Sequence, residues 1–410
     1  MLFIKRLHNN ITMPTIALYL KTHQPYRIKQ YRAFDVGHDH EYFNDKGEAN
    51  TNNVKILKKI CEKSYKPTNK LLLELLKKYP DFKFSISLSG TLLEQLEEHA
   101  PATLETFKKL VATGRVEVLG ETYYHSLSFY YSLSEFEEQV KLQNKLLKRL
   151  FDVVPKVFSN TELAYRNDLA AWAEKAGYKG IIAEGWDPIL GWRSSNFVYQ
   201  PEGTKKIKLL LKNYRLSDDI AFRFSNKEWS EWPLTADKFA TWVNALNGNA
   251  ETVNLFMDYE TFGEHQWEST GIFEFLKHMP KEIYKNKDNG FLTLSETCKE
   301  YTPKDTVDMP HIVTWADTER DLSAWTGNHM QQSSLSELYR IENQVLATKD
   351  KKLIDDWRKL QTSDHVYYMC TKWFADGDVH KYFSPYESPY EAYIAFTNAL
   401  TDLKLRAKII

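Results

Sequence analysis

The stretch VNLFMDYE at residues 253–260 predicts a buried β-strand that ends in carboxylates. Its apolar run, Val253–Met257, has the length of a strand and is too short for a helix of ordinary length. Asp258 follows this run directly. A second run of the same kind, Thr15–Lys21, ends in Thr22-His23-Gln24-Pro25. Both stretches suggest strands whose carboxyl ends carry polar side chains.

Strand-like runs and helical stretches alternate along most of the chain. The other candidate strands are Phe82–Leu88, Val116–Leu119, Val157–Ser159, Gly180–Ala183 and Ile207–Leu211. Helical periodicity is found at Asn53–Lys78, Thr103–Thr113, Leu133–Phe151, Asp168–Ala176 and Asp237–Leu246. This order predicts an α/β fold with a barrel of parallel strands.

The pattern becomes helical after about residue 325. Two apolar stripes at helical spacing follow, the first of Leu335, Leu338, Ile341 and Val345 and the second of Leu353, Trp357 and Leu360. Ser388-Pro389-Tyr390-Glu391 predicts the start of a last helix, with Ser388 as the cap and Glu391 reaching back as in a capping box. We therefore expect a catalytic barrel at 13–325 and a C-terminal helical region at 326–410 packed on it as one rigid unit.

The charge balance argues against nucleic acid and anionic membranes as partners. Lys and Arg number 54 against 55 Asp and Glu, a net charge of -1. We expect the basic run Lys205, Lys206, Lys208 and Lys212 to be a solvated hairpin face. No uncharged apolar stretch approaches the roughly 18 residues of a membrane-spanning helix. The N-terminus lacks a secretory pattern, so we expect a cytoplasmic protein, with Met13 as an alternative start.

Cysteine and aromatic content add two further expectations. Cys61, Cys298 and Cys370 lie far apart and form no CxxC motif, which favours buried free thiols over disulfides or a thiolate zinc site. Aromatic residues make up 14% of the chain. In a neutral chain, aromatic side chains outside the core suit a site that stacks on sugar rings.

Polar side chains follow five of the seven predicted strands. In strand order they are His23 and Gln24; Glu121 and His125; Glu162; Glu184 and Trp186; and Asp258. The carboxyl ends of the strands in a parallel α/β barrel meet at one rim, where active sites lie. The sequence therefore predicts a catalytic cleft at that rim.

Two of these carboxylates suggest glycoside chemistry. One carboxyl group must protonate the leaving oxygen while the other attacks or stabilises the sugar carbon. Glu162 lies between small polar residues, and burial at the end of its apolar strand would raise the pKa of Asp258 toward the acid role. Either residue alone could as well be a loop cap or a salt bridge, but the pair at one rim favours catalysis.

Five motifs occur in order along the chain: His23-Gln24-Pro25, Gly120–His125, Val157–Leu163, Met257–His265 and Trp315–Trp325. Together they resemble the motifs of glycoside hydrolase family 57, α-amylase-like branch. The resemblance implies an incomplete seven-stranded (β/α) barrel with a C-terminal helical lobe. It also implies a retaining α-glucanase in which Glu162 is the nucleophile and Asp258 the acid/base.

The same resemblance suggests further substrate-binding residues. His23, Glu121, His125, Glu264 and His265 would hold sugar hydroxyls or orient the catalytic pair, and Trp186, Trp315 and Trp325 would stack on glucose faces. Gln24, Glu184 and Asp317 complete the predicted set. The stretch Asp364–Met369 resembles a helical segment of this branch that either touches substrate or braces the barrel.

Several activities remain open at this stage. Hydrolysis of α-1,4 bonds in intracellular α-glucans or maltodextrins ranks first, and 4-α-glucan transfer through the same covalent intermediate ranks second. A non-catalytic α-glucan-binding protein would not need the carboxylate pair. A metal-dependent deacetylase would need an Asp and two His around one ion. His38-Asp39-His40 suits that chemistry superficially but lies in a charged loop, so we expect no metal and no cofactor. The oligomeric state is left open.

Overall fold

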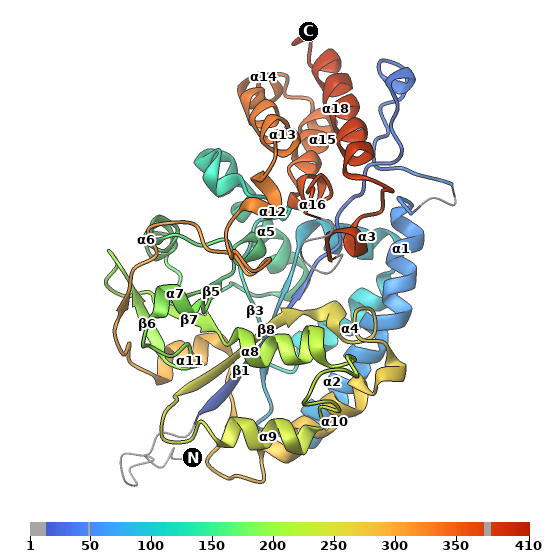
Figure 1. The fold of residues 1–410 in the computed structure, drawn as a ribbon. Coiled ribbons are helices and arrows are strands. Elements are labelled where there is room, and N and C mark those ends of the chain that lie inside the picture. The colour runs from blue at the N-terminus through green and yellow to red at the C-terminus, as the bar shows by residue number, and fades with distance from the viewer. Residues whose placement is uncertain (1–13, 48–49, 373–378) are drawn as a thin grey trace.

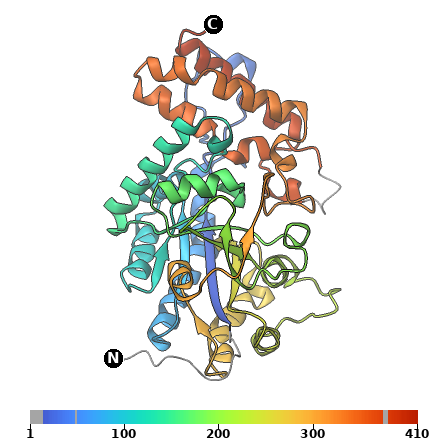
Figure 2. The ribbon, with the colours of Figure 1, turned by 90° about the vertical axis from the view of Figure 1, so that its left-hand side faces the viewer.

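A computed structural model describes residues 14–47, 50–372 and 379–410 of the chain (Figure 1). The alternative start at Met13 lies outside the described residues. Figures 1 and 2 show a barrel of strands wrapped by helices, with the C-terminal helices gathered at one end and the start of β1 at the other. The α/β fold with a helical lobe is confirmed.

The seven predicted strands are all present and parallel. Their bounds are β1 Thr15–Thr22, β2 Phe84–Leu88, β3 Val116–Val118, β4 Val157–Phe158, β5 Gly180–Glu184, β7 Lys208–Lys212 and β8 Thr252–Asp258. They pair in two groups, β3-β2-β1-β8 and β4-β5-β7. Two seams between the groups are thin: a bridge joins Gly120 to Phe158, and the Asn213 amide donates to the Asn254 carbonyl over 2.9 Å. The barrel is therefore incomplete, as the resemblance implied.

Three short strands were not predicted. β6 (Val198–Pro201) runs antiparallel to β7, β9 (Gly290–Phe291) pairs with β1, and β10 (Thr306–Val307) pairs with β6. They have two to four residues each and lie outside the seven parallel strands.

The solvated-face prediction is wrong for two of the four lysines. Lys208 Nζ donates to the carbonyl oxygens of Cys298 and Tyr301. Lys212 is buried and pairs with Asp218 and Glu184. Both lysines lie on β7 inside the fold, because the hairpin turn precedes this strand.

Helices cover the outside of the barrel. They are α1 Asn53–Ile60, α2 Lys66–Lys78, α3 Gly90–His99, α4 Pro101–Val111, α5 Leu133–Phe151, α6 Asn167–Lys175, α7 Asp187–Leu190, α8 Tyr214–Asp218, α9 Ala236–Asn244, α10 Ile272–Ile283 and α11 Leu294–Glu300. A π-helical turn at Cys61–Tyr65 joins α1 to α2, so the predicted long helix is continuous. The predicted stretches do not include α3, α7, α8, α10 and α11. Ser89 caps α3 by accepting a hydrogen bond from the Leu92 amide.

The helical lobe consists of α12 Ser323–Thr326, α13 His329–Arg340, α14 Glu342–Ala347, α15 Lys351–Leu360, α16 Ser363–Tyr367, α17 Val379–Phe383 and α18 Pro389–Arg406. Every residue of the two predicted apolar stripes is buried in its core. That core also takes in Ile28, Tyr31 and Tyr42 from the loop after β1. The domain boundary after residue 325 stays a prediction.

Local details of the sequence prediction hold with one exception. Ser388 caps α18 by accepting from the Glu391 amide, as expected. The Glu391 carboxylate, however, accepts from the Glu387 amide rather than from Ser388, so the capping box is not formed. All three cysteines are free and buried, which confirms that prediction. Among the described residues, no helix has both the length and the apolar character needed to cross a membrane.

Candidate active site

The residues after β1, β3, β4 and β8 meet at the end of the barrel that faces the helical lobe. β4 leads into a short 3₁₀ turn, Thr161–Leu163, that carries Glu162. β8 ends at Asp258, whose side chain is partly exposed. The charge of Glu162 contributes to the raised pKa of Asp258, so the two carboxyl groups lie within electrostatic reach of each other.

Both oxygens of the Glu162 carboxylate are held. His125 Nε2 lies 2.8 Å from Oε1, and the Trp315 indole N–H donates to Oε2 over 2.8 Å. Glu162 adopts φ 56° and ψ 25°, a left-handed conformation that costs about 1–2 kcal/mol for a residue with a side chain. With 20% of its side chain exposed, the carboxylate is fixed in place and still reachable by a ligand.

His125 is a neutral donor in this arrangement. Its side chain is buried and its pKa lies well below the ordinary value, because burial and the neighbouring His23 and Lys21 disfavour the imidazolium. A neutral imidazole carries one N–H and a carboxylate only accepts, so that proton sits on Nε2. This contact fits the orienting role, one of the two roles expected of His125, which stays a prediction.

A buried ion pair lies beneath the two carboxyl groups. Lys21 Nζ is 2.9 Å from Glu121 Oε2, and both side chains are almost completely buried. Glu121 therefore has no surface to offer a sugar; of its two expected roles, only positioning fits. The Lys21 charge lowers the pKa of both Glu162 and Asp258, against the larger opposing effect of burial.

The pKa of each candidate catalytic carboxyl group is raised above its ordinary value. For Glu162 the largest cause is burial, which the Trp315 hydrogen bond partly offsets. For Asp258 the largest cause is again burial, which the nearby His265 partly offsets. No hydrogen bond to the Asp258 carboxyl group is found among the described residues, so this group is free to exchange a proton with a ligand.

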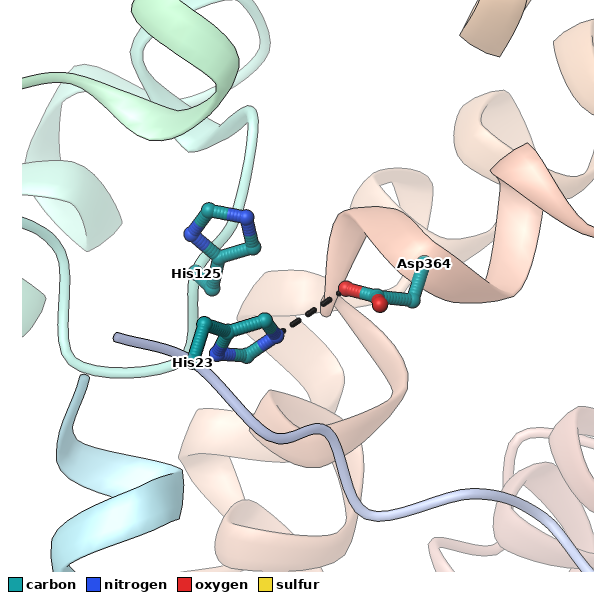
Figure 3. A group of neighbouring side chains, drawn as sticks. All are labelled: His23, His125 and Asp364. Carbon is teal, nitrogen blue, oxygen red and sulfur yellow. Dashed lines mark hydrogen bonds and ion pairs between the residues drawn. The ribbon is translucent and has the colours of Figure 1, made fainter. Parts of the chain in front are cut away.

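His23, His125 and Asp364 form a group that brings the lobe into the site (Figure 3). His23 Nε2 lies 3.0 Å from Asp364 Oδ2 on α16, and its Nδ1 lies 2.7 Å from Ser89 Oγ. Burial would raise the pKa of Asp364, but the neighbouring His23 outweighs it and lowers the pKa. The lobe thus supplies the Asp364 carboxylate to the rim. The sequence had not shown whether this segment reaches the site or only braces the barrel.

The same three residues have the donor types of a metal site, and their ligand atoms lie within 4.8 Å of one another. The two imidazoles, however, are only 33° from parallel with their centroids 4.0 Å apart. Ring nitrogens bind a metal in the plane of the ring, and His125 Nε2 is engaged with Glu162. This arrangement suits recognition of polar groups better than metal binding.

Two predicted sugar contacts are wrong. The Glu184 side chain has no exposed surface, since it lies between Lys212 at 3.5 Å and Arg320 at 3.2 Å. Trp325 is 1% exposed and packs against Tyr367 in the core of the lobe. The position of Glu184 at a strand end and of Trp325 in a motif does not show in which direction each side chain points.

The remaining predicted residues lie around the rim in different settings. Trp186 is half-buried against the outer core of the barrel. Gln24 is buried and accepts a hydrogen bond from Arg27. Glu264 pairs with Lys59 and Lys63 of the α1–α2 region, and Asp317 pairs with His380.

The sequence pattern assigned no role to two buried groups near the site. Lys21 was predicted only as the last residue of a strand. Its position directly before Thr22-His23 could have suggested a buried positive charge close to the catalytic rim. Glu260 accepts a hydrogen bond from Tyr65, and burial followed by the charge of Asp258 raises its pKa to about 8. Glu260 is therefore mostly protonated at neutral pH and leaves Asp258 without a charged neighbour two residues away.

The family model described as glycosyl hydrolase family 57 matches residues 17–310. The chain belongs to this family. It is 41% identical over 405 residues to a Methanocaldococcus jannaschii protein named "Putative alpha-amylase", covering 96% of this chain and 85% of that one. It is 22% identical over 259 residues to a Thermococcus litoralis 4-alpha-glucanotransferase, covering 61% of this chain and 38% of the relative.

Solved structures of the family share the fold. The GH57-type branching enzyme from Pyrococcus horikoshii superposes with a TM-score of 0.67 at 16% identity, covering 90% of this chain and 87% of that one. At this identity the likeness shows the fold alone. The family membership makes the chain a glycoside hydrolase family enzyme, in agreement with the resemblance of its five motifs.

Proposed function

We propose that this enzyme cleaves α-1,4-glucosidic bonds of α-glucans or maltodextrins with retention of configuration. The observation that carries the proposal is the Glu162 carboxylate held by His125 and Trp315 within electrostatic reach of Asp258, whose pKa is raised. The α-amylase and glucanotransferase names of its relatives support the choice of α-glucan.

In the first step Asp258, whose raised pKa favours the protonated form, donates its proton to the glycosidic oxygen. A Glu162 oxygen bonds to the anomeric carbon as the bond to the leaving sugar breaks. His125 and Trp315 keep the Glu162 oxygens from turning away during this attack. The products are a free sugar chain and a glucosyl ester of Glu162.

In the second step Asp258, now ionised, removes a proton from water, and the water oxygen displaces Glu162 from the anomeric carbon. Two inversions give net retention. This mechanism needs the two carboxyl groups about 5–5.5 Å apart, and we predict that separation for the complex with substrate.

Transfer to a sugar hydroxyl instead of water is the second candidate, since a relative is named 4-alpha-glucanotransferase. Products of maltoheptaose, separated by chromatography, distinguish the two. Shorter sugars alone indicate hydrolysis, and sugars longer than seven glucose units indicate transfer. A protein that binds maltoheptaose without forming any product would instead be a glucan-binding protein.

Early products followed by proton NMR test the stereochemistry. The α anomer should form first and then mutarotate to the equilibrium mixture. Initial formation of the β anomer would mean an inverting enzyme and would contradict the role of Glu162 as nucleophile.

A cytoplasmic location, with α-glucan as the partner, forms part of the proposal.

A further inference from the structure

Helix α17 runs back from the helical lobe to the rim of the barrel. Its His380 side chain is fully buried, and His380 Nε2 lies 3.0 Å from Asp317 Oδ1 in the loop after β10. The His380 ring stacks on Tyr367 of α16, with centroids 4.5 Å apart at 28°. Lys372 adds a second cation 3.4 Å from Asp317 Oδ2. These contacts fix a five-residue helix in one place.

The ion pair persists at neutral pH. Burial by itself would lower the pKa of His380, but its contacts with Asp317 and Cys370 outweigh burial and raise the pKa to about 9. The same contacts lower the pKa of Asp317, against the opposing effect of burial. Both partners are thus charged near pH 7, and α17 is attached to the loop by a charged pair.

This attachment places two aromatic rings against His265. The Phe383 ring centroid lies 5.3 Å from that of His265 at 82°, and the Tyr382 centroid lies 6.2 Å away at 78°. The Tyr382 and Phe383 rings meet each other at 5.0 Å and 85°. Despite these edge-to-face contacts, Tyr382 is 59% exposed and Phe383 is 36% exposed.

His265 connects these rings to the candidate catalytic pair. The His265 amide donates to the Glu260 carbonyl over 2.9 Å, two residues after Asp258 at the end of β8. Asp258 and His265 also shift the pKa of each other, which agrees with their proximity. The exposed rings therefore lie on the Asp258 side of the candidate active site. Exposed apolar surface beside such a polar site is characteristic of ligand binding.

We propose that Tyr382 and Phe383 form an outer sugar-binding subsite on the Asp258 side of the cleft. A glucose ring has an apolar face of C–H groups, which stacks on an aromatic ring while its hydroxyl groups stay in water. The subsite would be filled by long maltooligosaccharides and left empty by short ones. This inference rests on the proposed function and adds to it a preference for chain length.

The test compares Tyr382→Ala/Phe383→Ala with the parent enzyme on maltoheptaose and on p-nitrophenyl α-maltoside. Loss of stacking should raise KM for maltoheptaose about tenfold, which corresponds to about 1.4 kcal/mol. The kcat and the KM for the short substrate should stay within about twofold of the parent values. The unfolding temperature should stay within about 2 °C of that of the parent, because the substituted rings are exposed. Tyr382→Trp should keep the parent KM because Trp also stacks.

Phe34→Ala is the matched control, since Phe34 is 89% exposed and lies on the loop after β1. It should change neither KM. An unchanged KM for maltoheptaose in the double variant would overturn the inference, and so would an equal rise for the short substrate. A parent enzyme that neither cleaves nor binds maltoheptaose in calorimetry would contradict the proposed function and this inference together. Parent activity with no effect of the substitutions would contradict the inference alone.

Discussion

Glu162 and Asp258 act in different steps of the proposed reaction, so their variants should fail differently. Glu162→Gln and Asp258→Asn should each lower kcat on α-1,4-glucan at least about a thousandfold, a loss of about 4 kcal/mol of transition-state stabilisation. Steady-state kinetics on maltoheptaose measures the loss. Glu274→Gln, on the exposed face of α10, is the control and should keep full activity.

Azide distinguishes the two roles. With a substrate that has a good leaving group, azide should restore turnover to Asp258→Asn, because a small anion can attack the glucosyl enzyme without base assistance. It should not restore retaining turnover to Glu162→Gln. The reverse pattern would mean that the nucleophile and the acid/base are exchanged.

The Trp315 indole should affect the pH dependence of the reaction. Its hydrogen bond lowers the pKa of Glu162, which burial otherwise raises. Trp315→Phe removes the donor, so the Glu162 pKa rises further and the acid limb of kcat/KM should move to higher pH. A loss of about 10- to 100-fold in kcat follows from a charge-assisted hydrogen bond of about 1.5–3 kcal/mol. An unchanged acid limb would show that Glu162 does not set it; Trp192→Phe, at an exposed site, is the control.

The Asp258 carboxyl group should lower the free energy of unfolding of the enzyme at neutral pH. Its pKa is raised in the folded protein, so the folded state binds more protons than the unfolded state between the unfolded and folded pKa values. Stability from this group therefore falls as the pH rises through that window. Asp258→Asn removes the charge and should unfold at the same or a higher temperature than the parent at pH 7. A clear drop, measured by calorimetry, would mean that the carboxylate has a stabilising partner.

At the level of single residues, the sequence predicted which residue types form the candidate site better than it predicted the contacts that these residues make. Glu162 and Asp258 could be selected because a carboxylate after a short strand is a local signal. The His23–Asp364 contact joins residues 341 positions apart, and no local pattern encodes such a distance. Glu184 also stands at the carboxyl end of a strand, yet Lys212 and Arg320 cover it. Position in the chain gives the rim but not the direction of each side chain.

Among the elements, the lobe should be tightly coupled to the candidate site of the barrel, because α16 carries Asp364 into that site.

The core of the lobe can be tested at Leu338, which is fully buried on α13. Leu338→Ala should destabilise the protein by about 2–5 kcal/mol, the usual cost of emptying a leucine site. Thermal unfolding measures this, and Leu405→Ala, at a partly exposed position of α18, should cost far less. Equal effects would mean that the lobe core is loosely packed.

Element prediction succeeded for the seven parallel strands and for the stripes of α13 to α15. It did not find α10, although this helix has twelve residues. β9 and β10 have two residues each and form only because their neighbours supply a pairing edge. α3 was missed because Phe84–Leu88 and Ser89 precede it without a break, so its start could not be separated from the strand.

For the molecule as a whole, the proposed chemistry uses two carboxyl groups and needs no Lewis acid. Activity on maltoheptaose should therefore stay unchanged after dialysis against a chelator, and the unfolding temperature should not move. Loss of activity that zinc or another transition metal restores would make the His23, His125 and Asp364 group a metal site and would favour metal-assisted hydrolysis.

The central claim is that Glu162 forms a covalent bond to the cleaved sugar. Treating the enzyme with 5-fluoro-α-glucosyl fluoride, which slows breakdown of the intermediate, followed by peptide mass spectrometry, tests this bond directly. The account predicts that the peptide containing Glu162 gains one fluoroglucosyl group and that Glu162→Gln gains none. Labelling of the Asp258 peptide, or rapid turnover that yields the β anomer with no label on any peptide, would contradict it.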